Sequence, residues 1–233
     1  MESDRHASIF CKEMKLGDLI DANYKLLTIL SRLGIRLGFG EITVEEMCRR
    51  YDLSPQLFLI ICRIYTFDGY FPLCSELDED DLRHIVDYLQ ASHRYYKEYS
   101  LPRLRDGVNQ TVESCDELHR KVLDKFFTDY CSEVASHFAY EEETVFPYIR
   151  ALLDGERPVG FSIDRFEDNH SDIDEKLNDM KSIIIKYLPE DCPTEQRNDM
   201  LFEIFRFEED LARHTLIEDR LMIPLVAKIE QQL

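Results

Sequence analysis

The sequence contains no apolar run long enough to cross a membrane. Its most hydrophobic stretch, residues 57–67, reads LFLIICRIYTF and includes Arg63, whereas a membrane-spanning helix needs about 20 apolar residues. The first residues, MESDRHASIF, are charged and contain no apolar segment of the secretory type. We therefore expect a cytoplasmic protein without a membrane partner.

Paired cysteine motifs are also absent. The seven cysteines are odd in number and scattered, and no two of them form a Cys-x-x-Cys pair. This usage is typical of a reducing compartment and argues against both a disulfide framework and a zinc site. We predict that the cysteines are free thiols.

Positive charge is scarce in one part of the chain. Residues 1–75 hold nine Lys and Arg against ten Asp and Glu, whereas residues 76–233 hold 19 against 37. The acidic part repels phosphate backbones and anionic lipids, so neither nucleic acid nor a membrane is expected to bind it. The near-neutral first part is not covered by this argument.

Strand alternation is nearly absent, and helical periodicity dominates. Residues 17–35 (GDLIDANYKLLTILSRLGI) are amphipathic, residues 43–46 (TVEE) have the form of a capping box, and Ser54-Pro55 is typical of a helix start. A linker-like stretch follows at 68–81. We predict a small helical N-terminal domain over residues 1–70 and a second domain over residues 77–233.

Four long helical segments make up the second predicted domain. They cover residues 77–104, 111–152, 162–187 and 195–231, and turn-rich breaks separate them at 105–110, 153–160 and 188–195. Short connections between long helices favour antiparallel neighbours. The expected fold class is therefore all-α, with an up-down-up-down four-helix bundle after the small helical domain.

Polar residues interrupt the apolar stripe of every bundle helix near its middle. The stripes run at steps of three and four residues: Leu82, Val86, Leu89, His93 and Tyr96; Leu123, Phe127, Tyr130, Val134, His137, Glu141, Val145 and Tyr148; Phe166, His170, Ile173, Leu177, Met180 and Ile184; Leu201, Phe205, Leu211, His214, Glu218, Leu221 and Leu225. Burying a carboxylate without a partner costs on the order of several kcal/mol. A metal would satisfy these groups together.

The spacing of the polar residues repeats along the chain. Two pairs of histidines are each 44 residues apart, and the second histidine of each pair has a Glu four residues later on the same helix face. Two such units around a pseudo-two-fold axis predict two metals, each bound by two histidines and bridged by both glutamates. The predicted ligands are His93, His137, Glu141, His170, His214 and Glu218.

Three metals are compatible with this set of donor groups. Imidazole with carboxylate suits iron, manganese or zinc. A ferritin-like carboxylate site is a rival, but it needs two Glu-x-x-His pairs, and the sequence has only Glu167 with His170. Glu142 and Asp219 directly follow two predicted ligands and lie about 100° further round the helix, so we expect both to tolerate substitution.

Four segments of the bundle resemble one known family. The segments ASHRYYKEYSLPRL, SHFAYEEETVFPYI, EDNHSDIDEKL and RHTLIEDRLMIPLV are together similar to the hemerythrin-like, HHE cation-binding family, over about residues 80–230. The four-His, two-Glu set resembles the di-iron subgroup that repairs iron–sulfur clusters. The resemblance implies the same six ligands and two non-haem iron ions with oxo and carboxylate bridges. Oxygen-carrying hemerythrins place a further His where this chain has Asp174, which disfavours a simple oxygen carrier.

The N-terminal part resembles the small domain that precedes the bundle in those repair proteins. The similarity lies in LGDLIDANYKLLTILSRLGIRLGFGEITVEEMC, residues 16–48. The family has a Cys-Cys pair just after the Gly-Ile, and this chain has Gly38 and Phe39 near those places. A thiol function of that pair is therefore not carried over.

Three functions are compatible with the sequence. The leading expectation is a di-iron protein of the oxidative and nitrosative stress response that restores damaged iron–sulfur proteins and whose irons bind oxygen, nitric oxide or peroxide. A second is a sensing module, in which ligand binding at the irons shifts the N-terminal helices against a partner. A third is a nitric oxide or peroxide reductase, which uses two metals and needs an electron source that the sequence does not reveal.

Overall fold

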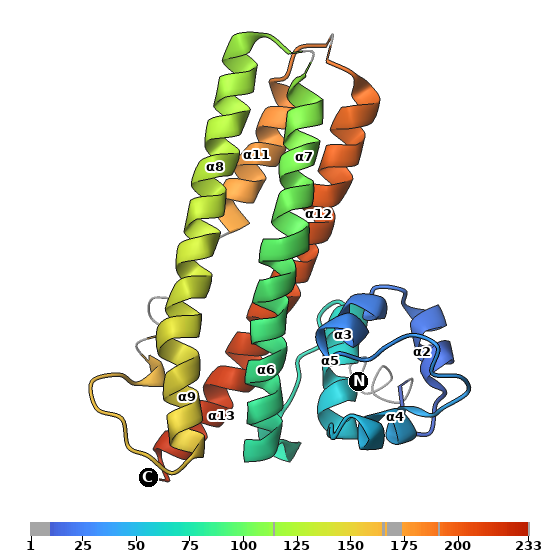
Figure 1. Ribbon diagram of the computed structural model, residues 1–233, viewed down its shortest axis with the longest axis vertical. Helices are drawn as coiled ribbons and strands as arrows, with labels where there is room; N and C mark the ends of the chain where they lie inside the picture. Colours follow the sequence, from blue (N-terminus) through green and yellow to red (C-terminus); the bar gives the residue numbers. More distant parts are fainter. Residues whose placement is uncertain (1–9, 114, 165, 167–173, 191, 233) are drawn as a thin grey trace. The chain divides into compact units, whose positions relative to one another are not determined.

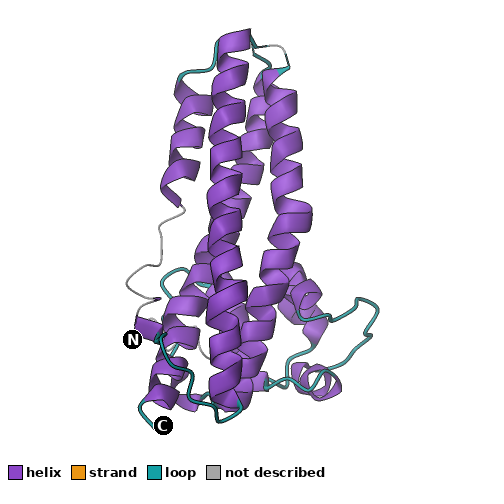
Figure 2. Ribbon diagram, turned by 60° about the vertical axis from the view of Figure 1, so that its left-hand side comes forward, coloured by secondary structure: helices purple, strands orange, loops and turns teal. Residues whose placement is uncertain are grey.

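The computed structural model describes residues 10–113, 115–164, 166, 174–190 and 192–232. Within these ranges the chain forms helices and loops and no strand, as Figure 2 shows, so the predicted all-α class is confirmed. None of the helices described is both long enough and apolar enough to cross a membrane.

Proximity of Cα atoms divides the chain into two compact units. The first unit comprises Met1–Ser92, Tyr148–Glu167 and Arg213–Leu233, and the second comprises His93–Pro147 and Asp168–Ala212. The first unit contains the N-terminal helices, and the second contains the apolar core of the bundle.

Among the described residues of the first unit, four short helices come first: α2 (Leu16–Ala22), α3 (Leu26–Arg32), α4 (Val44–Arg50) and α5 (Pro55–Thr66). The predicted capping box is present, because Thr43 Oγ1 accepts from the Glu46 N–H and Glu46 accepts from the Thr43 N–H. Ser54 caps α5 by accepting from the Leu57 N–H. Short-range sequence signals therefore set the starts of α4 and α5.

Helix α5 is buried on nearly every side and connects α3 to a longer helix, α6 (Glu79–Tyr95). The buried guanidinium of Arg32 donates to the Tyr65 hydroxyl at 2.9 Å and to the Tyr88 hydroxyl at 3.4 Å. Tyr88 in turn donates to Tyr65 at 3.1 Å. A buried charge needs such partners, so this triad fixes α3 and α5 against α6.

The division into domains 1–70 and 77–233 stays a prediction, and a fragment that begins at Ser75 tests it. The fragment keeps every predicted ligand, so we expect it to fold and bind metal. The fragment also lacks Arg32 and Tyr65, the hydrogen-bonding partners of Tyr88. Its melting temperature should therefore fall, by about 2–4 °C for each kcal/mol of unfolding free energy lost. Circular dichroism during heating measures the fold and the melting temperature, and metal analysis measures the binding. An unfolded fragment would contradict the division.

The rest of the first unit contains the ends of the long helical segments. These ends are α9 (Phe146–Leu153) and α13 (Ile223–Glu230). A 3-10 turn lies at Cys74–Glu76, before α6. Glu230 of α13 accepts hydrogen bonds from the Tyr148 hydroxyl and, at 3.0 Å, from the Ile163 N–H. One carboxylate thus ties α9 and the segment after it to α13.

The second unit packs four helices around one apolar core. They are α7 (Leu101–Val112), α8 (Glu117–Tyr140), α11 (Asp174–Lys186) and the first part of α12 (Thr194–Ile217). Figures 1 and 2 both show them side by side, with the short α7–α8 and α11–α12 connections at one end. The described residues thus form the expected up-down-up-down bundle.

The first helical break lies elsewhere than predicted. The chain is helical from Glu79 to Val112, and the break falls after Val112 instead of at residues 105–110. Gly107, which suggested a turn, lies inside α7, and a Cβ at this position would come within 2.6 Å of the Met200 sulfur on α12. The glycine therefore allows close packing of α7 against Met200 and does not reverse the chain.

The prediction of free thiols is wrong for two of the seven cysteines. Cys115, after α7, and Cys192, before α12, form a disulfide with a Cα–Cα distance of 5.8 Å. Their spacing of 77 residues gave no signal in the sequence, because only the bundle fold brings the two connections together. Five other cysteines are free, and burial raises the pKa of the Cys48 thiol to about 12.

Removing this disulfide should lower stability without removing metal. The double change Cys115→Ser and Cys192→Ser frees a long loop in the unfolded chain, and we expect the free energy of unfolding to fall by about 2–4 kcal/mol. Urea unfolding measures it, with Cys131→Ser, a free thiol of the same unit, as control. Equal midpoints for all three proteins would contradict the crosslink.

Candidate metal centre

Three prolines shape the helices that carry the predicted ligands. A π-helical turn precedes each proline by one residue: η2 (Tyr96–Ser100) before Pro102, η3 (Glu141–Val145) before Pro147, and η4 (Glu218–Met222) before Pro224. Proline has no N–H and cannot make the usual helical bond. In η3 the Phe146 N–H instead donates to the Glu141 carbonyl, and η4 repeats this pattern. Such π-turns occur frequently at functional sites.

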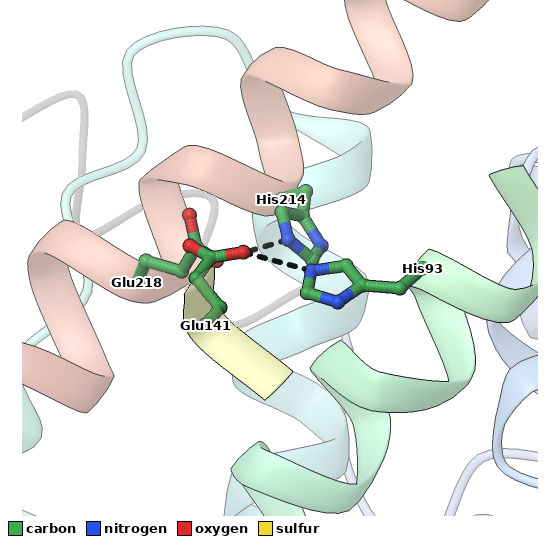
Figure 3. Close-up of side chains that lie close together, drawn as sticks. All are labelled: His93, Glu141, His214 and Glu218. Carbon is green, nitrogen blue, oxygen red and sulfur yellow. Dashed lines mark ion pairs between the residues drawn. The ribbon is translucent and has the colours of Figure 1, made fainter. Parts of the chain in front are cut away.

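Four of the six predicted ligands come together. One ligand atom from each of His93, Glu141, His214 and Glu218 lies within 4.8 Å of all the others. His93 is on α6 and His214 on α12, and each glutamate is the first residue of a π-turn. Figure 3 shows the four side chains pointing toward one another.

The imidazoles meet the carboxylates through the same ring nitrogen. His93 Nε2 lies 3.1 Å from Glu141 Oε2, and His214 Nε2 lies 2.9 Å from Glu218 Oε1. The second of these pairs is the predicted i, i+4 arrangement on one helix face. A shared use of Nε2 leaves each Nδ1 for an outer partner, which is how metal-binding histidines are usually oriented.

Burial and charge at the cluster indicate a cation. Glu141 and Glu218 are fully buried, and His93 and His214 are at most 1 % exposed. Two carboxylates confined together out of water repel each other and are costly to desolvate. A divalent metal removes both penalties, and imidazole with carboxylate is a fitting donor set for a transition metal.

The remaining two predicted ligands differ from these four. His137 Nε2 lies 3.2 Å from Glu141 Oε1, but its side chain keeps 10 % exposure and is not part of the four-residue cluster. His170 lies outside the described residues. The sequence prediction of six ligands therefore stays a prediction for these two histidines.

A comparison with known families identifies the fold that carries the cluster. Residues 84–226, more than half of the chain, match the hemerythrin HHE cation-binding domain. This chain belongs to the hemerythrin HHE family. It is a cation-binding protein, and the buried cluster is its candidate metal site. No curated protein matches the chain.

One further residue of the hemerythrin domain touches the cluster and is not among the predicted ligands. Glu142, expected to be tolerant, places Oε1 3.1 Å from Nδ1 of His93. Lys97 donates to the two Glu142 oxygens at 2.8 and 3.1 Å. The available signal was the position of Lys97, one helical turn after His93 on the same face.

Glu142 can fix which nitrogen of His93 binds metal. A metal-bound Nε2 carries no proton, so the ring proton is on Nδ1 and donates to Glu142. Partial burial raises the pKa of the Glu142 carboxyl, but the hydrogen bond and charge of Lys97 outweigh burial, with His93 adding to them, and the pKa lies below its ordinary value. The carboxylate is therefore ionised at neutral pH. Phe138 stacks on the same imidazole at 4.1 Å.

Loss of Glu142 should weaken metal binding although it is not among the predicted ligands. Glu142→Ala removes the acceptor of the His93 Nδ1 proton, and outer partners of this kind are worth about 10–100-fold in metal affinity. Competition with a chelator measures the affinity. The metal affinity of Glu142→Gln, which keeps an acceptor oxygen, should lie between that of Glu142→Ala and that of the unchanged protein. Glu143→Ala, an exposed neighbour, is the control, and equal losses in both alanine variants would contradict the role.

Proposed function

We propose that this protein holds two non-haem irons and acts in the response to oxidative or nitrosative stress. The buried His93, Glu141, His214 and Glu218 cluster is the observation that carries the proposal. Its imidazole and carboxylate donors suit iron, and the hemerythrin HHE family is a cation-binding one.

The proposed pair of irons uses the six ligands of the sequence repeat. Glu141 and Glu218 would be shared by the two irons, His93 and His137 would come from one half of the repeat, and His170 and His214 from the other. Iron with open positions supplies binding and one-electron chemistry toward oxygen, nitric oxide or peroxide. The protein's own part is to hold the donors away from water and to orient His93 through Glu142.

We propose that the partners of this protein are cytoplasmic iron–sulfur proteins whose clusters have been damaged by these oxidants. The resemblance of the four-His, two-Glu set to repair proteins supports this, and so does the helical region before the bundle. The latter contains Gly38 and Phe39 where the repair family has its cysteine pair, so any repair activity must act without that pair.

Metal analysis of anaerobically purified protein is the decisive experiment. Two irons per chain, with the optical bands of an oxo bridge after oxidation, are expected. Recovery of activity by an enzyme with a damaged iron–sulfur cluster is then measured with and without the protein. Absence of iron would reject the centre, and two irons without recovery would reject repair alone.

Sensing is a second candidate because of the Arg32, Tyr65 and Tyr88 triad. The triad joins α3 and α5 to α6, the helix that also carries His93. A change at the metal therefore has a packed connection to the N-terminal helices. Arg32→Met should change the protection of α3 and α5 from hydrogen exchange and should abolish any difference in that protection between reduced and oxidised protein.

Nucleic acid is a poor candidate for the partner in such sensing. A helix that reads a DNA groove must expose one face, and α5 buries Leu57, Phe58, Leu59, Ile60, Ile61, Cys62, Ile64 and Tyr65. A protein partner of the exposed faces of α2 and α4 fits the near-neutral charge of this part better.

A further inference from the structure

A continuous series of aromatic rings connects His93 to the surface. Phe138 stacks on the His93 ring at 4.1 Å and on Tyr96 at 5.7 Å between ring centres. Tyr96 meets Tyr95 edge-on at 6.3 Å, and Tyr95 stacks on Tyr99 at 5.6 Å. We call these five residues the aromatic path, and all of them lie in the second unit.

The aromatic path begins in a dry core and ends in water. His93, Phe138 and Tyr96 are fully buried, Tyr95 is partly buried, and Tyr99 is 63 % exposed. The π-turn η2 begins at Tyr96, so three of the rings fall within one short helical stretch next to a predicted metal ligand. Packing alone requires aromatic rings in the core, but it does not require an oxidisable phenol at each of the last three positions.

We propose that the aromatic path carries single electrons from Tyr99 to the metal centre when the metal reacts with hydrogen peroxide. This proposal rests on iron being the bound metal. Reduction of one peroxide to two waters breaks its O–O bond and takes two electrons and two protons. Two ferrous ions would supply both electrons, but a centre that holds one ferrous and one ferric ion would supply only one of them. Tyr99 supplies the other electron, leaving a tyrosyl radical, and water receives the phenolic proton that it loses.

The chemistry of the side chains supports this direction of transfer. A phenol that keeps a radical must also lose its proton, and Tyr99 is the most exposed of the three tyrosines in the path. The Tyr96 hydroxyl donates at 3.3 Å to the backbone carbonyl of Asp210, which is not a base. Tyr96 therefore relays the electron, and the radical comes to rest at Tyr99. The path moves oxidising equivalents away from the buried ligands to a place where a small one-electron reductant can quench them.

Site-resolved oxidation tests the aromatic path. Iron-loaded protein is first half-oxidised, so that one iron of each pair is ferrous, and is then treated with one equivalent of peroxide per ferrous ion. A radical-trapping phenol labels tyrosyl radicals, and peptide mass spectrometry locates them. Tyr24 and Tyr187 are 71 % and 67 % exposed and serve as internal controls of equal access. We expect labelling at Tyr99 to exceed labelling at these two by at least several-fold. Protein loaded with redox-inert zinc should show no such preference.

Two matched variants decide whether Tyr96 is the relay. Tyr96→Phe keeps the ring but removes the oxidisable phenol, and it should lower Tyr99 labelling to the level of Tyr187. Tyr130→Phe removes another buried phenol that also packs on Phe207, and it should change nothing. Iron per chain is measured in every sample.

The results of these experiments distinguish a failure of the aromatic path from a failure of the proposed iron centre. Iron-loaded protein without a preference for Tyr99 overturns the aromatic path and leaves the iron centre standing. An unchanged preference in Tyr96→Phe also overturns it. A chain that retains no iron overturns both proposals.

Discussion

Glu141→Gln and Glu218→Gln are expected to cost the protein most of its metal. Each change removes one negative charge with little change in volume, at a side chain that is fully buried and within 4.8 Å of the other ligand atoms. The loss should exceed the about 10–100-fold in affinity that follows removal of an outer partner. Because the two glutamates occupy equivalent first positions of π-turns, their losses should be similar. Metal per chain after dialysis measures both.

Glu143→Gln is the matched control for these two variants. It makes the same change of charge within the same π-turn, but its side chain is exposed. We expect it to keep its metal. If Glu143→Gln loses metal while Glu141→Gln retains it, the cluster in Figure 3 is not the binding site. If only one of the two buried glutamates matters, the symmetric bridging arrangement is wrong, although the cluster remains.

His214→Ala should both remove metal and destabilise the metal-free protein. His214 is 1 % exposed, and its Nε2 lies 2.9 Å from the buried Glu218 carboxylate. Removing one member of a buried pair leaves the other's charge poorly compensated, which costs about 3–5 kcal/mol. Urea unfolding in the presence of a chelator measures this cost without the metal's own contribution.

His137→Ala distinguishes a ligand from a packing residue. Its side chain has 10 % exposure, so water can partly replace it beside Glu141, and the metal-free protein should lose less stability than in His214→Ala. Metal content should still fall, because the sequence repeat makes His137 equivalent to His214. A His137→Ala protein with full metal content would remove this histidine from the ligand set. His119→Ala, outside the stripes, is the control for both.

Local signals in the sequence were sufficient for much of the helix pattern. Leu123, Phe127, Tyr130 and Val134 are buried at the predicted steps, because one face of a helix in a bundle must be apolar. The same logic misplaced Phe205. Its ring is 48 % exposed beneath the Lys181 ammonium, at 5.0 Å, while Ile204 and Phe207 fill the core. Two adjacent apolar stripes on α12 were available, and only the packing partners selected one.

The sequence by itself determined the helical class, the caps at Thr43 and Ser54, and the ligand-bearing stripes, because each depends on residues within a few turns of one another. Tertiary structure alone decided three other features. Helix α7 continues through the expected break at Gly107, where Met200 of α12 packs closely against it. Cys115 and Cys192 form a disulfide because the fold brings together the connection after α7 and the connection before α12. The neighbouring helix turns His93 Nδ1 onto Glu142. Each of these joins residues far apart in the chain, and no local propensity encodes such a pairing.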